Sequence, residues 1–252
     1  MVSIVLIALI SFIHPESVLP VEGKIYVSDI GKFGVGDGMI LTIQGDTVAT
    51  NLIDPKGLAY YDGKLFVTDV NRIWEVTPEG KRIEFVPRTA FQPEAKFLND
   101  IAKYRGKIYV SDTYTNRVFR IDIKDPKPRK IFEIEKPNGI CFDGKGTMYI
   151  ITFTIPAKIF SYRKGKLLKV FEDRRFNGGD GIVFYKNRFY ATFYISGQVV
   201  ELKREGKELK LTKIIKDGLK SPADLGLYRD TLFIPLLNEG KILKINLKEV
   251  GR

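Results

Sequence analysis

The sequence predicts an all-β protein, a six-bladed β-propeller whose blades are four-stranded antiparallel sheets of about 40 residues. The first observation is a repeated stretch, of which Gly106–Asp112, with the sequence Gly-Lys-Ile-Tyr-Val-Ser-Asp, is the clearest copy. The copies begin at residues 23, 63, 106, 146, 187 and 230, so the steps are 40 to 43 residues. A period in this range is typical of repeat architectures. The second observation is that no segment has a convincing helical pattern of apolar residues.

Each repeat is expected to contain four strands. The repeated stretch alternates aromatic or β-branched residues with polar ones and lies between turn formers, which indicates a strand. A short apolar strand that opens with a turn precedes it, as at residues 137–141. Another strand follows, as at 117–122, and then a more polar one, as at 130–134. The short opening strand should therefore lie innermost and the polar strand outermost.

Length and charge fit a single domain with a solvated surface. Six even repeats occupy the 252 residues, so we expect one domain, residues 1–252. The net charge is +11, but the basic residues are spread over predicted turns and outer strands together with many acidic ones. We therefore expect no nucleic-acid partner, with affinity for an acidic partner as the less favoured alternative. Many charges of both signs also suit a heat-stable protein.

The single cysteine and the single histidine limit the chemistry. One cysteine, Cys141, excludes an internal disulfide, so redox chemistry does not define the compartment. Because the only histidine, His14, is far away in the sequence, we expect Cys141 to be a buried, inert thiol. The sequence has no Gly-x-Ser-x-Gly elbow, no Walker loop and no clustered Cys/His site, which argues against serine hydrolases, P-loop enzymes and zinc enzymes.

Residues 2–13 form an apolar run that is too short to span a bilayer as a helix, so we expect no stable membrane span. Two roles are open for residues 1–13. As the outer strand of the last blade, they would fill the position that the sixth repeat leaves empty. As an export signal they would be removed, although no positive charge precedes the run and no small-x-small pattern follows it. We expect a cytoplasmic protein, with an exported or periplasmic one as the alternative.

Equivalent positions of a propeller form a ring around the central channel, so the residues that open the inner strands should meet at one mouth. These residues are Glu16, Lys56, Asn99, Asn138, Asp180 and Ala223. Four of the six carry carboxylate or amide oxygens, which are the ligands of hard divalent cations. Ordinary turn chemistry explains Asn or Asp before Gly at any single position. For the four together, we expect a cation site, with Ca²⁺ favoured and Mg²⁺ or Mn²⁺ as alternatives.

The motifs around this ring resemble those of the regucalcin/gluconolactonase family of six-bladed propellers. They are Glu16-Ser17 before Lys24–Ile30, then Phe97–Asp100, Pro137–Ile140 and Gly179–Ile182, in this order. The resemblance implies that Glu16, Asn138 and Asp180 bind one divalent metal and that Asn99 lines the substrate site. It also implies an N-terminal strand that completes the last blade. Phe97 stands where the family has a substrate-binding Arg.

We therefore expect a metal-dependent hydrolase of lactones or related esters, with a small-molecule substrate and its site at one mouth of the channel. Asp180 would bind the metal and act as general base, and Asn99 would hydrogen-bond the substrate or the developing oxyanion. Lys56 would orient the substrate or replace the metal.

Two alternatives to this enzyme stay open. One is a non-catalytic NHL-like propeller that binds a protein or a small ligand. Its aromatic anchors would be Phe33, Tyr114, Phe153 and Tyr194, in or near connecting segments. The other is a related propeller with different chemistry, such as strictosidine synthase-like condensation or sugar dehydrogenation.

Overall fold

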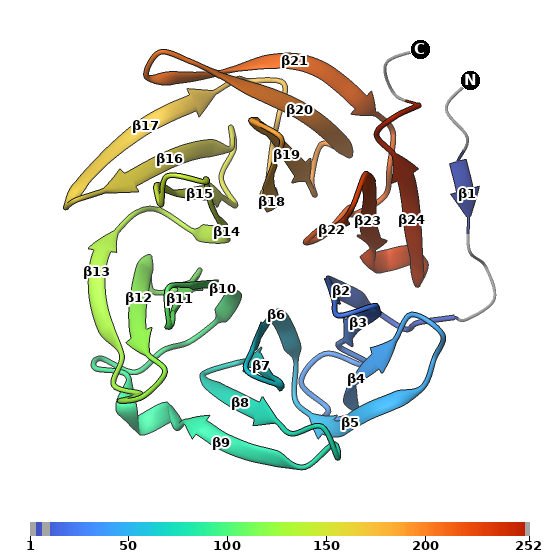
Figure 1. Cartoon of the computed structure of the whole chain (residues 1–252), viewed down its shortest axis with the longest axis vertical. Coiled ribbons are helices and arrows are strands. Elements are labelled where there is room, and N and C mark those ends of the chain that lie inside the picture. Colours follow the sequence, from blue (N-terminus) through green and yellow to red (C-terminus); the bar gives the residue numbers. More distant parts are fainter. Residues whose placement is uncertain (1–3, 7–10, 250–252) are drawn as a thin grey trace.

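A computed structural model describes residues 4–6 and 11–249 of the chain. Six four-stranded antiparallel sheets stand around a central channel (Figure 1), which confirms the six-bladed β-propeller. Within the described residues, the helical elements are two short 3₁₀ turns, η1 (Arg88–Ala90) and η2 (Leu237–Glu239). Neither turn has the length or the hydropathy of a helix that crosses a membrane.

The first five blades take their strands in chain order from the channel outwards. Blade 1 contains β2 (Pro15–Val21), β3 (Lys24–Asp29), β4 (Gly38–Thr42) and β5 (Thr47–Leu52). Blade 2 contains β6 (Pro55–Tyr61), β7 (Lys64–Asp69), β8 (Arg72–Val76) and β9 (Arg82–Val86). Blade 3 contains β10 (Leu98–Tyr104), β11 (Lys107–Asp112), β12 (Arg117–Asp122) and β13 (Arg129–Glu133). Blade 4 contains β14 (Pro137–Phe142), β15 (Met148–Thr152), β16 (Lys158–Arg163) and β17 (Lys166–Glu172). Blade 5 contains β18 (Gly179–Tyr185), β19 (Arg188–Phe193), β20 (Gln198–Glu205) and β21 (Glu208–Lys216).

Blade 6 joins the two ends of the chain. Its strands are β22 (Gly226–Tyr228), β23 (Thr231–Leu236), β24 (Lys241–Asn246) and, outermost, β1 (Ile4–Leu6). Strand β1 pairs antiparallel with β24, beside which it lies in Figure 1. Residues 2, 3 and 7–10 of the apolar run lie outside the described residues. A role of the run as an export signal stays a prediction, which N-terminal sequencing of the native protein tests.

The core consists of apolar clusters between neighbouring blades. Between blades 2 and 3, Phe91 and Phe119 are fully buried and meet edge to face, with ring centroids 5.1 Å apart. Between blades 6 and 1, Phe233 and Ile242 pack with Val18 of the first inner strand. Burial of each such side chain contributes about 1.5–3 kcal/mol. The clusters therefore hold the six inner strands in fixed positions around the channel.

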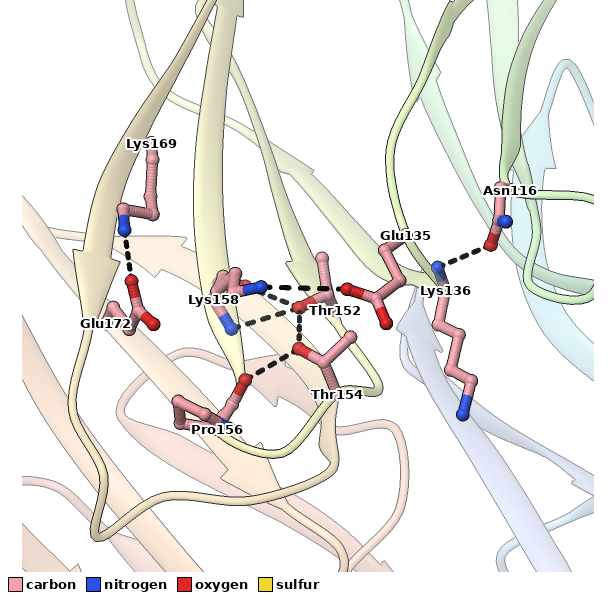
Figure 2. A network of polar contacts seen from close by, with 9 residues as sticks. All are labelled: Asn116, Glu135, Lys136, Thr152, Thr154, Pro156, Lys158, Lys169 and Glu172. Atoms are coloured by element: carbon pink, nitrogen blue, oxygen red, sulfur yellow. Dashed lines mark hydrogen bonds and ion pairs between the residues drawn. The ribbon is translucent and has the colours of Figure 1, made fainter.

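The Asp that ends the repeated stretch holds the loop before the inner strand. In three blades this carboxylate accepts two backbone N–H groups of that loop. Asp29 accepts from Ile13 (2.8 Å) and His14 (2.7 Å), Asp69 from Ile53 (3.0 Å) and Asp54 (2.7 Å), and Asp112 from Lys96 (3.1 Å) and Phe97 (2.9 Å). In blade 4, Thr152 stands at this position, and its hydroxyl accepts instead from the N–H of Lys158, the first residue of the third strand, at 3.0 Å (Figure 2). These carboxylates are therefore structural.

Candidate functional site

A β-bulge lies at the start of each of the first five inner strands, where the predicted ring residues stand. A bulge re-aims side chains and leaves a backbone group without its partner in the sheet. In three blades a hydroxyl of the second strand accepts from that N–H group. Ser28 accepts from Ser17 N (2.9 Å), Ser111 from Asp100 N (3.0 Å) and Thr192 from Gly181 N (2.8 Å). The bulges thus give the ring residues one shared orientation. We call the end of the channel where these residues stand the ring mouth.

Glycines let neighbouring inner strands approach closely beside the ring. A Cβ atom at Gly57 would lie 2.7 Å from the carbonyl oxygen of Asn99. A Cβ atom at Gly181 would lie 2.6 Å from Oδ1 of Asp224. Both distances are below van der Waals contact, so only glycine fits. The close approach gathers the ring side chains around a narrow channel.

The six ring residues are buried, each at most 6% exposed. Three of them have an oxygen atom without a hydrogen-bond partner: Glu16 Oε2, Asn138 Oδ1 and Asp180 Oδ1. The described residues contain seven such buried side-chain atoms, and the other four are scattered over blades 2, 4 and 5. An unpaired buried polar atom costs about 1–3 kcal/mol. Three of these atoms at one mouth make the ring a candidate binding site for a group that can pair with them.

The charge of Asp180 acts on Glu16, and Asn138 forms a hydrogen bond with Asp180. Burial, and then the charges of Asp180 and Asp224, raise the pKa of Glu16 well above its usual range. Burial and the charge of Asp100 raise the pKa of Asp180 to about 7, and a hydrogen bond from the Asn138 side chain opposes this rise. Charge effects of this kind are strong between groups within about 4–6 Å of each other, and a hydrogen bond requires direct contact. The structure therefore brings Glu16, Asn138 and Asp180 together.

Two further carboxyl groups lie one residue along the inner strands from the ring. Burial raises the pKa of Asp100 to about 6, although Asp100 accepts the N–H groups of Ile140 and Ile101. Burial and the charge of Asp100 raise the pKa of Asp224 well above its usual range, and Ser17 Oγ donates to Asp224 at 2.7 Å. Sequence reasoning missed both, although each directly follows a ring position.

Asp100, Asp224 and Cys141 line a cavity of about 450 Å³ in the channel beside the ring. Burial and nearby acidic groups raise the pKa of the Cys141 thiol well above its usual range, so the thiol is protonated, as expected. Two larger cavities, of about 660 and 690 Å³, are grooves between neighbouring blades. None of the six ring residues lines any of these three cavities. The channel, with four carboxyl groups and one ammonium, would be strongly negative if every group were ionised.

The ammonium group of Lys56 contacts Asp54 and Phe97. The ammonium donates to the carbonyl oxygen of Asp54 at 3.0 Å and lies 4.3 Å from the ring centroid of Phe97. Burial lowers the pKa of Lys56, and the charge of Glu16 opposes this effect. None of the three unpaired oxygens accepts a hydrogen bond from Lys56.

The two remaining ring residues, Asn99 and Ala223, differ in their polar side-chain atoms. Asn99 Nδ2 donates to Thr113 Oγ1 at 3.2 Å, and Thr113 Oγ1 donates to the carbonyl oxygen of Pro137 at 2.7 Å. The amide of Asn99 is therefore held in one orientation and has a second N–H group to donate. Ala223 contributes no polar side-chain atom to the ring.

The unpaired atoms are the oxygens of two carboxyl groups and one amide, a donor set that suits a hard divalent cation. The described residues contain no group of three or more His, Cys, Asp or Glu side chains arranged for one metal ion. The ring therefore differs from an all-carboxylate site and from a Cys/His zinc site.

Fold and ring together define a six-bladed β-propeller with a buried, oxygen-lined mouth. The family model of the teneurin NHL domain matches residues 34–131. No curated protein matches the sequence. The chain is similar in structure to a gluconolactonase from Xanthomonas campestris, with a TM-score of 0.73 and 15% identity over 94% of this chain and 86% of that one.

Virginiamycin B lyase from Staphylococcus aureus is a second structural neighbour. Its selenomethionine form has a TM-score of 0.66 and 13% identity over 98% of this chain and 99% of the lyase. A catalytically inactive variant with quinupristin has a TM-score of 0.67 and 15% identity over the same shares. At these identities the likeness shows the fold, which is that of a gluconolactonase-like, NHL-type six-bladed propeller.

Proposed function

We propose that the protein is a metal-dependent hydrolase of lactones or related esters, with its site at the ring mouth. The observation that carries this proposal is the set of three buried, unpaired oxygens of Glu16, Asn138 and Asp180. The likeness of the fold to a gluconolactonase supports the same reaction class.

Glu16, Asn138 and Asp180 would hold the metal, with Ca²⁺ favoured over Mg²⁺ and Mn²⁺. Two carboxylates and one amide provide the hard oxygen ligands that these ions prefer. When bound, the ion supplies Lewis acidity at the carbonyl group of the substrate.

Asp180 and Asn99 are the residues of the chain that would take part directly in the reaction. Asp180 would accept the proton of a water molecule that attacks the carbonyl carbon. The proton passes to the alkoxide oxygen when the ester C–O bond breaks. Asn99, held by Thr113, donates its second N–H group to the oxyanion that develops at the carbonyl. Lys56 would orient the substrate from its place beside Asp54.

The test is hydrolysis of a panel of lactones after treatment with a chelator and again after addition of Ca²⁺ or Mn²⁺. We expect activity to return with the ion and to fall by about 100-fold or more in Asp180→Asn. The matched control is Asp143→Asn, because Asp143 is also buried but caps a turn at the far end of blade 4. This control should keep its activity. Hydrolysis that is indifferent to the chelator and to Asp180→Asn would contradict the proposal.

The match to the teneurin NHL domain supports a second candidate, a non-catalytic propeller that binds a protein or a small ligand. Calorimetric titration with Ca²⁺ and Mn²⁺ separates the two candidates. Binding heat and a rise in melting temperature favour the hydrolase, and the absence of both favours the binding protein. Product masses separate hydrolysis from a lyase reaction, because a hydrolysed lactone gains one water molecule and an eliminated one does not.

A further inference from the structure

Exposed apolar side chains gather on the face of the propeller that carries the ring mouth. The ring face consists of the loops that enter the inner strands and the loops between the second and third strands of the blades. Five large apolar side chains of the described residues are more than half exposed. Four of them lie on the ring face: Phe33, Val35, Tyr114 and Ile155. The fifth, Leu168, lies on the outer strand β17.

The loops of the ring face also carry no net charge. Its loops are residues 11–14, 30–37, 53–54, 70–71, 87–97, 113–116, 134–136, 153–157, 173–178, 194–197, 217–222 and 237–240. These loops carry as many acidic as basic side chains, so the excess of 11 positive charges lies elsewhere on the molecule. An apolar, balanced face fits an uncharged ligand better than an acidic one.

Two aromatic rings form a ledge on this face. Phe97 and Tyr114 stack with their centroids 4.3 Å apart and an angle of 25° between their planes. Phe97 is partly buried, whereas Tyr114 is 66% exposed. We call this pair the aromatic ledge. The exposed ring of Tyr114 can accept a further flat, apolar group by stacking.

The aromatic ledge is joined to the ring at two points. Lys56 lies 4.3 Å from the ring centroid of Phe97, and its charge interacts with that of Glu16. Thr113, the neighbour of Tyr114 in the chain, holds the side chain of Asn99. The aromatic ledge therefore borders the ring mouth on the side where Lys56 and Asn99 stand.

From these contacts we infer that the site accepts uncharged lactones or esters that carry an aromatic ring, an inference that rests on the proposed hydrolase function. The aromatic ledge would hold the aromatic ring of the substrate while the carbonyl group lies over the ring mouth. A polyhydroxylated lactone has no flat apolar ring that could stack on Tyr114.

The experiment compares kcat/KM for three lactones: the aromatic dihydrocoumarin, the saturated δ-valerolactone and the polyhydroxylated glucono-δ-lactone. The wild type should prefer dihydrocoumarin by about tenfold or more. Tyr114→Ala should reduce kcat/KM for dihydrocoumarin about tenfold and leave that for δ-valerolactone unchanged. Tyr114→Phe should keep the preference, because it keeps the ring. The control Phe33→Ala removes an exposed aromatic ring outside the ledge and should leave all three values unchanged.

Each outcome separates this inference from the proposed function. Equal or faster hydrolysis of glucono-δ-lactone by the wild type, or equal losses on all substrates in Tyr114→Ala, overturns the inference and leaves the hydrolase intact. Failure to hydrolyse any lactone defeats the hydrolase. The ledge is then tested by calorimetric titration with the lactam analogue of dihydrocoumarin. Binding that Tyr114→Ala abolishes supports the ledge as an aromatic-binding site, and absence of binding to the wild type contradicts it.

Discussion

Replacing Asp180 by Asn should make the metal-free protein more stable at alkaline pH. The pKa of Asp180 rises from 3.8 to about 7 in the folded state, mainly because the carboxyl group is buried. Below about pH 4 the group is protonated in both the folded and the unfolded chain and makes no difference to stability. As the pH rises towards 7, the unfolded chain loses this proton while the folded chain retains it. The wild type therefore loses stability between about pH 4 and pH 7.

The size of this effect follows from the shift of the pKa. A rise from 3.8 to about 7 corresponds to about 4 kcal/mol of lost stability above pH 7. Asn has nearly the shape of the protonated carboxyl group and carries no charge at any pH. The free energy of unfolding of Asp180→Asn should thus equal that of the wild type near pH 3.5 and exceed it by up to about 4 kcal/mol near pH 8.

The assay is denaturation by urea in the presence of a chelator at several pH values between about 3.5 and 8. Asp143→Asn is the matched control and should be less stable than the wild type at neutral pH. The substitution keeps the acceptor oxygen but removes the negative charge that strengthens the hydrogen bonds from the N–H groups of Lys145 and Thr147. Addition of Ca²⁺ should reverse the order of Asp180→Asn and the wild type, since binding stabilises only the chain that keeps its ligand. A difference between the two that does not change with pH, or a less stable Asp180→Asn near pH 8, would refute the reasoning.

Three further predictions concern the scaffold of the site. Gly181→Ala places a Cβ atom 2.6 Å from Oδ1 of Asp224, so urea denaturation should show a loss of about 1–3 kcal/mol; an unchanged midpoint would show that the strands can separate. Thr113→Val removes the hydroxyl group that holds the side chain of Asn99, so kcat for lactones should fall about tenfold with little change in KM. A change in KM alone would contradict the proposed role of Asn99. Deletion of residues 1–10 removes β1 and exposes the edge of β24, so the melting temperature should fall and light scattering should detect association; an unchanged, monodisperse protein would speak against closure by β1.

The fold could be predicted from the sequence because each repeat carries the same pattern of strand and turn residues. Copies of the stretch at Gly106–Asp112 recur at nearly even steps, and the inner position of each opening strand followed from its apolar composition. The four oxygen-bearing ring positions could be aligned for the same reason. Equivalent residues of successive blades occupy equivalent places around one axis.

The chemistry of the ring could be predicted only in part. Asp100 and Asp224 were missed because an Asp next to a turn looks the same in sequence whether it is solvated or buried in the channel. The β-bulges and the hydroxyl groups that satisfy them depend on the pairing between strands, which no single strand reveals. The direction of the Lys56 side chain depends on Asp54 and Phe97, and a position in an alignment does not determine it.

A crystal structure of the protein grown with Ca²⁺ tests the central claim most directly. We expect one ion at the ring mouth, with oxygen atoms of Glu16, Asn138 and Asp180 at about 2.3–2.6 Å from it. The Lys56 ammonium should remain beside Asp54 and Phe97. A ring mouth that holds no ion at saturating Ca²⁺, or that holds the Lys56 ammonium between the three oxygens, would contradict the account.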